Sequence, residues 1–272
     1  MPDTRGLTER RIRHLVATAA RVLTIPWRQH VFAPARVSSV FGCSFGCGGW
    51  QHLVRTLEEF RADPAIGWRS TTLAAFHRAF CPRNVFDVVG RDVDAPPFVF
   101  PWGPFSVGFR RKEVLSSRFC GPSTDDFIRD EFERLIRLYE RIRSTGYRPW
   151  SFGHGFLYGT ILVDRTGARR FVVLQGNHRM AALAVLGAEA VSVRTDPRRL
   201  LAVVREEECE RWPLVQSQVC SVSDAIAVFR MFFEQNGLHV LRRMEGEVGC
   251  WGGVRRASDL RPPMRAPRSP WG

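Results

Sequence analysis

Apolar residues recur with the spacing of an α-helix in several stretches of the chain. Because a helix has about 3.6 residues per turn, its buried face returns every three or four positions. The clearest stretch begins at Phe127 and continues to Gly146, and Ser123 and Asp126 before it are spaced for a capping box. The same criterion predicts further helices over residues 7–23, 50–61, 71–80, 177–186 and 223–236, the last with Ser223 as its N-cap.

Runs of β-branched and aromatic residues predict strands between the later helices. Two of these runs, 160–163 and 171–174, flank the segment Asp164–Ala168, whose composition is typical of a hairpin loop. A third strand is predicted over 191–194, whereas the apolar residues 200–204 are ambiguous. Helices and strands in this order predict an α+β fold built on a small mixed sheet.

The charge of the chain first suggests nucleic acid as a partner. The formal net charge is +13 over 272 residues, of which 44% are hydrophobic. However, Lys112 is the only lysine, and the other 39 basic residues are arginine. Residues 251–272 alone carry five Arg against one Asp. The charge therefore indicates an arginine-rich surface with a basic tail rather than a phosphate-binding footprint.

The cysteines and the hydropathy pattern favour a reducing compartment. The seven cysteines are an odd number in a chain large enough to bury a core without disulfides. The apolar stretch near the N-terminus ends at Arg21 and is too short for a secretory signal. No apolar run approaches the 18 or so residues that a membrane-spanning helix needs. A cytoplasmic protein with free thiols and no membrane partner is expected.

The stretch from Phe171 to Gly187 carries the most chemical information. A strand runs into Gly176, and a helix with a polar start follows at once with Asn177, His178 and Arg179. The first turn of a helix presents unpaired N–H groups and the positive end of the helix dipole, which together attract anions. Two potential cations in that turn are balanced best by a bound anion, so this turn is the candidate phosphate site.

At this turn the sequence resembles a known family. Gly176-Asn177-His178-Arg179, followed by Ala181-Ala182-Leu183 and Leu186-Gly187, is similar to the signature helix of the ParB/sulfiredoxin superfamily. The helix 125–143, Gly146-Tyr147-Arg148-Pro149, the hairpin 160–174 and the strand 191–193 extend the resemblance over residues 123–205. The resemblance implies a nucleotide-binding module in which Gly176, Asn177, His178 and Arg179 contact phosphates.

The resemblance also sets the expected domain organisation. Residues 1–122 would form a helical and loop-rich N-terminal region, and residues 123–205 the ParB/sulfiredoxin-like domain. Residues 206–250, with one clear helix, would form a C-terminal helical segment, and residues 251–272 a disordered basic tail.

Three members of the superfamily differ from this chain at the turn. Sulfiredoxins carry a catalytic cysteine, and partition proteins usually a glutamate, where this chain has Asn177. Partition proteins also continue into a helix-turn-helix region, whereas residues 206–250 predict a single clear helix. Free-serine kinases carry an aspartate where this chain has Gln175 as a possible polar partner. A replacement carboxylate could come from Asp164, Glu140 or Glu131.

These observations predict a nucleotide- or phosphate-binding protein. The expected chemistry is phosphoryl transfer to a small molecule or nucleotide hydrolysis, with a nucleoside triphosphate or diphosphate and Mg²⁺. Arg179 would neutralise developing charge, and His178 would donate a hydrogen bond or act as an acid or base. The alternative is a non-enzymatic, DNA-associated ParB-like regulator.

Two competing motifs lie in the first hundred residues. Gly42-Cys43-Ser44-Phe45-Gly46 matches the nucleophile elbow of serine hydrolases, with Ser44 as nucleophile and His154 as a candidate base. Only about forty residues precede it, too few for the strands that an α/β-hydrolase needs before its elbow. Separately, Cys43, Cys47, His77 and Cys81 are four potential ligands for a tetrahedral zinc ion. The sequence leaves both possibilities open.

Overall fold

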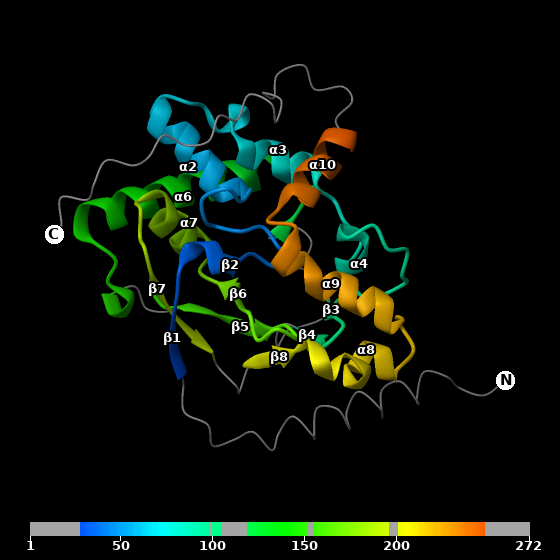
Figure 1. The fold of residues 1–272 in the computed structure, drawn as a ribbon. Coiled ribbons are helices and arrows are strands. Elements are labelled where there is room, and N and C mark those ends of the chain that lie inside the picture. Colours follow the sequence, from blue (N-terminus) through cyan, green and yellow to red (C-terminus); the bar gives the residue numbers. More distant parts are fainter. Residues whose placement is uncertain (1–27, 98, 105–118, 152–154, 196–200, 248–272) are drawn as a thin grey trace.

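The computed structural model describes residues 28–97, 99–104, 119–151, 155–195 and 201–247. A mixed β-sheet lies at its centre with helices on both faces (Figure 1). The predicted α+β class is therefore confirmed at this general level. The helix expected over 7–23 and the tail 251–272 lie outside the described residues. None of the helices in the described ranges is long and apolar enough to cross a membrane.

The sheet has the strand order β1-β7-β5-β6-β2, and β8 pairs with β5 beyond the end of β7. The hairpin of β5 and β6 is antiparallel, as predicted, and β7 and β8 both run parallel to β5. The strands are β1 (Arg28–Phe32), β2 (Val37–Ser38), β5 (Leu157–Val163), β6 (Arg169–Gln175), β7 (Val191–Thr195) and β8 (Val203–Arg205). A separate small hairpin joins β3 (Val99–Phe100) to β4 (Gly103–Pro104).

Both edges of the sheet come from the N-terminal part of the chain. Strand β1 pairs antiparallel with β7, so that Arg28 lies opposite Thr195. Strand β2 pairs parallel with β6, so that Val37 lies opposite Phe171. The sheet thus crosses the expected boundary between residues 122 and 123.

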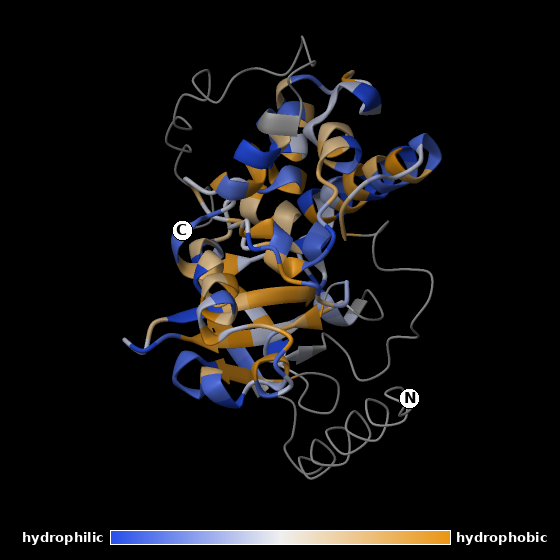
Figure 2. Ribbon diagram, turned by 90° about the vertical axis from the view of Figure 1, so that its right-hand side faces the viewer, coloured by the Kyte–Doolittle hydropathy of each residue, from blue (hydrophilic) through white to orange (hydrophobic). Residues whose placement is uncertain are grey.

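The helices occupy two layers (Figure 1). On one face α2, α6 and α7 pack on the sheet through a core that includes Leu57, Leu135 and Met180. On the other face α9 and the β3–β4 hairpin bury an aromatic cluster that includes Phe100 and Phe229. The strands are mostly hydrophobic, whereas the helices alternate between hydrophobic and hydrophilic residues (Figure 2). The helices are α2 (His52–Ala62), α3 (Thr72–Ala79), α4 (Val85–Val88), α6 (Asp125–Thr145), α7 (Asn177–Val185), α8 (Pro213–Gln216), α9 (Val222–Glu234) and α10 (Leu238–Glu247).

Two predicted N-caps are wrong by one or two residues. The cap of α6 is Thr124, whose hydroxyl accepts from the Phe127 N–H, because the Ser123 hydroxyl is engaged by a histidine of α3 instead. The cap of α9 is Ser221, not Ser223. Ser221 and Asp224 form a full capping box, in which each side chain satisfies a backbone N–H of the other.

The expectation of a single clear helix over residues 206–250 is also wrong. Besides α9, this segment contains α8 and α10, and only three residues separate α9 from α10. Asn236 and Gly237 adopt positive φ in the connecting turn, which sends the chain into α10. The helical pair packs inward, since Val228, Phe232 and Val240 are fully buried.

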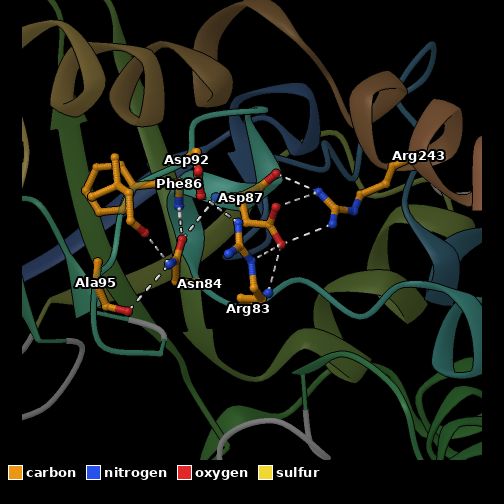
Figure 3. Close-up of polar contacts among 8 residues, drawn as sticks. Arg83, Asn84, Phe86, Asp87, Asp92, Ala95 and Arg243 are labelled. Carbon is orange, nitrogen blue, oxygen red and sulfur yellow. Dashed lines mark hydrogen bonds and ion pairs between the residues drawn. The ribbon is translucent and has the colours of Figure 1, made fainter.

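An ion pair between Arg243 and Asp87 connects α10 to α4 (Figure 3). Arg243 reaches from α10 to Asp87, where its guanidinium donates to both carboxylate oxygens at 3.2 and 3.0 Å and to the backbone carbonyl. Burial opposes ionisation of Asp87, but the N–H of Arg83 and the guanidinium of Arg243 outweigh it and lower the pKa of this carboxyl. Asn84 caps α4 beside this pair by accepting from two backbone N–H groups.

Replacement of Arg243 by alanine is expected to lower the free energy of unfolding by about 1–3 kcal/mol, because the half-buried Asp87 loses its charged partner. Urea unfolding followed by circular dichroism measures the change. The matched control is Arg129→Ala, which removes an exposed pair with Asp126 on α6 and should cost less than about 0.5 kcal/mol. Equal losses for the two variants would contradict this account of the α4–α10 contact.

Candidate functional site

The candidate site is the turn between β6 and α7. Strand β6 ends at Gln175, Gly176 adopts a left-handed conformation with φ 106°, and α7 begins at Asn177, as predicted. A Cβ atom at position 176 would lie 2.8 Å from Leu157 Cδ2 on β5. Glycine is thus required both for the backbone conformation and for the close contact with β5.

The first turn of α7 has the geometry of an anion site. The carbonyl of Gly176 accepts the first helical hydrogen bond, from the Met180 N–H at 2.9 Å, and Gly176 has no side chain to cap the helix. The N–H groups of the first turn precede this bond, and the geometry of a helix supplies no intrahelical acceptor for them. The Asn177 Oδ1 atom is buried and has no hydrogen-bond partner among the described residues.

Arg179 lies over the turn. A Cβ atom at Gly176 would be 3.5 Å from both Cζ and Nε of the Arg179 guanidinium. Burial lowers the pKa of this guanidinium, and interaction with the hydroxyls of Tyr147 and Tyr158 opposes that shift. Desolvated arginine is a strong anion ligand because water competes less for its donors.

A carboxylate stands beside the turn, on α6. His178 Nε2 lies 3.0 Å from Glu131 Oε2, and the two side chains are only 16% and 14% exposed. Arg134 contacts both oxygens of Glu131, at 2.6 and 2.7 Å. Burial disfavours the charged form of Glu131, but the contact with His178 and the charge of Arg134 outweigh it and lower the pKa of this carboxyl. Glu131 is therefore held as a carboxylate against the first turn of α7.

Of the three carboxylates considered from the sequence, Glu131 is the one at the turn. Asp164 accepts from the backbone N–H groups of Thr166 and Ala168 and so closes its own hairpin loop. Glu140 pairs with Arg143 on the outer face of α6. Gln175, the possible polar partner, is exposed at the end of β6 opposite Tyr158.

Two further histidines lie near the pair formed by His178 and Glu131. The sequence did not assign them to this site. His77 on α3 places Nδ1 3.1 Å from the Ser123 hydroxyl, and burial lowers its pKa to about 4. His52 on α2 stacks on Phe76 with ring centroids 3.8 Å apart, and burial lowers its pKa well below the usual value. The electrostatic influence of His178 reaches both rings. Four helices thus bring three histidines and Glu131 together.

The structure also shows the surroundings of the serine-hydrolase motif and of two potential zinc ligands. Ser44 is buried, and its hydroxyl donates to the Ala35 carbonyl and accepts from the Gly46 N–H, which suits a turn rather than an exposed nucleophile. His154 lies outside the described residues. Cys43 is buried and Cys47 is exposed. Within the described part of the chain, no three His, Cys, Asp or Glu side chains form a group that could hold a metal ion.

Comparison of the chain with protein-family models, with curated proteins and with solved structures finds no match. The site is therefore interpreted from its own chemistry.

Proposed function

We propose that the protein binds a nucleotide or a phosphorylated small molecule at Gly176–Arg179 and that phosphoryl transfer or nucleotide hydrolysis takes place there. The observation that carries the proposal is the 3.0 Å contact between His178 in the first turn of α7 and the partly buried Glu131 of α6. A carboxylate and a histidine paired at an anion-binding helix start supply the acid–base groups that such a reaction needs.

The chain order around the turn supports the same proposal. Helix α6, the β5–β6 hairpin, helix α7 and strand β7 follow one another as in the ParB/sulfiredoxin superfamily that the sequence resembles.

Each residue has a distinct task in this proposal. The N–H groups of residues 177–179 hold phosphate oxygens, and Arg179 neutralises the charge that develops as the phosphoryl group leaves. His178 takes the proton from the attacking hydroxyl or water, and Glu131, kept ionised, stabilises the imidazolium that forms. Because phosphoryl transfer demands mainly positioning and charge neutralisation, this small set of groups is chemically sufficient.

The described residues at the turn do not form a Mg²⁺ site of their own, so Mg²⁺ would arrive bound to the phosphates of the nucleotide. The oxygens of Glu131 already face Arg134 and His178, and the described residues contain no group of three carboxylate, histidine or cysteine ligands. Mg²⁺ commonly keeps several waters and binds through substrate phosphates rather than through a full protein cage. When bound, it would supply charge neutralisation on the phosphates.

Titration calorimetry with ATP, CTP, GTP and ADP, with and without Mg²⁺, tests the proposal. We expect at least one nucleotide to bind, and Arg179→Ala to weaken that binding roughly ten- to hundredfold, the effect of losing a charged hydrogen bond. The matched control is Arg137→Ala, which removes an exposed pair with Glu133 on α6 and should bind like the wild type. If none of the nucleotides binds, or if Arg179→Ala binds as well as the wild type, the proposal fails.

A further inference from the structure

A cavity lies beside the candidate site, at the end of the sheet where β5 and β7 begin and β6 ends. Its volume is about 420 Å³, within the range of small-molecule pockets. Its lining includes Tyr147, Trp150, Phe156, Leu183, Ser192 and Arg194.

The strand register explains why this cavity exists. Strand β5 pairs with β7 only from Leu157 opposite Val193 onward. Ser192 and Val191, at the start of β7, therefore have β1 on one side and no paired residue of β5 on the other. Tyr147, Trp150 and Phe156, which precede β5 in the chain, supply the aromatic wall.

The cavity wall suits a flat, nitrogen-containing ring. The Arg194 guanidinium lies 3.3 Å from the centroid of the Phe156 ring, which gives a planar and polar surface. Trp150 contributes an indole that is 75% exposed, an unusual position for a large aromatic side chain. The Ser192 hydroxyl is buried and has no hydrogen-bond partner among the described residues. Exposed aromatic surface and an unsatisfied hydroxyl are the two groups that a stacking, hydrogen-bonding ligand would satisfy.

The cavity and the α7 turn are adjacent. Phe156 immediately precedes Leu157, the residue that touches Gly176. Leu183 follows Arg179 by four residues and so lies on the same face of α7, about 6 Å further along the helix. Tyr147 lines the cavity, and the charges of both Arg179 and Arg194 act on its hydroxyl. The cavity and the turn are thus linked by neighbouring residues on β5 and on α7.

We infer that the cavity between Trp150, Phe156 and Ser192 is the nucleobase subsite of the nucleotide whose phosphates bind at the α7 turn. The inference rests on the proposed function and specifies its ligand as a nucleotide rather than a simple phosphate ester. The base stacks on the indole of Trp150 and exchanges a hydrogen bond with the Ser192 hydroxyl.

Binding of nucleotides and of inorganic tripolyphosphate to Trp150→Ala and Ser192→Ala variants tests the inference. Both variants should bind the preferred nucleotide about five- to hundredfold more weakly than the wild type, since base stacking is lost or a polar contact is removed. Their affinity for tripolyphosphate, which has no base, should stay unchanged. Trp68→Ala is the matched control, because Trp68 lies in the 3₁₀ turn Trp68–Ser70 between α2 and α3, outside the lining of the cavity.

The outcomes separate this inference from the proposed function. If nucleotides bind in a manner that depends on Arg179 but not on Trp150 or Ser192, the base subsite is refuted and the phosphate site stands. If the Trp150 variant loses tripolyphosphate as strongly as nucleotide, the cavity is not a base subsite. If the wild type binds neither nucleotide nor tripolyphosphate, both the proposed function and this inference fall.

Discussion

Lowering the pH from 7 to 4 is expected to remove much of the folding stability of this protein. Burial lowers the pKa of His77 and of His239 from 6.5 to about 4, and that of His52 well below its usual value. Between pH 6.5 and 4 the unfolded chain binds protons at these positions and the folded chain does not. Stability must therefore fall as the pH falls through this window.

The expected loss of folding stability can be estimated from the pKa shifts of His77 and His239. A difference of one pKa unit between the folded and unfolded states corresponds to about 1.4 kcal/mol. His77 and His239 therefore each lower the free energy of unfolding by about 3 kcal/mol by pH 4. Their sum of about 6 kcal/mol is comparable to the whole stability of a typical domain, about 5–15 kcal/mol. Glu131 acts in the same direction below pH 4.5 because its pKa is lowered, whereas Glu59, whose pKa is raised by burial, opposes the loss.

Urea unfolding at pH 7, 6, 5 and 4 measures this dependence. The variants His77→Gln and His239→Gln should each reduce the pH dependence of the free energy of unfolding by the equivalent of about one proton, because glutamine cannot titrate. His239→Gln can keep a hydrogen bond to the Phe41 carbonyl, which His239 Nε2 contacts at 2.8 Å. A midpoint that stays constant from pH 7 to 4.5 would show that these rings are not held neutral by burial.

Replacement of Phe76 by alanine is expected to cost about 3–5 kcal/mol of stability. Phe76 is fully buried on α3 and contacts the rings of Phe41, Trp50, His52 and Phe80. Alanine would leave a cavity that these rigid rings cannot fill. The exposed aromatic control, Trp150→Ala, should change stability by less than about 0.5 kcal/mol.

Chemical unfolding of both variants measures the two losses of stability. Because the ring of Phe76 also supports His52, the Phe76 variant should weaken the packing around the histidine cluster. A loss below about 1 kcal/mol would mean that the α2–α3 layer can repack around the deletion, contrary to the rigid packing described above.

Local patterns predicted most of the α6–β7 region. The periodicity of α6, the hairpin loop at Asp164 and the start of α7 at Asn177 depend on residues close together in sequence. The caps were less predictable because several hydroxyls compete at each helix start. Ser123 was the wrong choice for a reason that no local pattern contains: His77 uses its hydroxyl.

Features that depend on distant contacts were missed. Strand β1 has no strong alternation of its own and exists as a strand through its pairing with β7. The turn at Gly176–Arg179 could be found from sequence because its residues are consecutive. The choice of Glu131 among three carboxylates, and the approach of His52 and His77, could not, since they result from the packing of four helices.

The pairing of residue 28 with residue 195 also has a consequence for synthesis of the protein. While the ribosome is making the middle of the chain, the first strand has no partner, and the edge of β6 that β2 covers does not yet exist. The central sheet can close only after β7 has left the exit tunnel. Long-range closure of this kind slows folding and prolongs exposure of strand edges. Nascent chains halted while β7 is still inside the tunnel should therefore depend on chaperones more than chains long enough to expose β7.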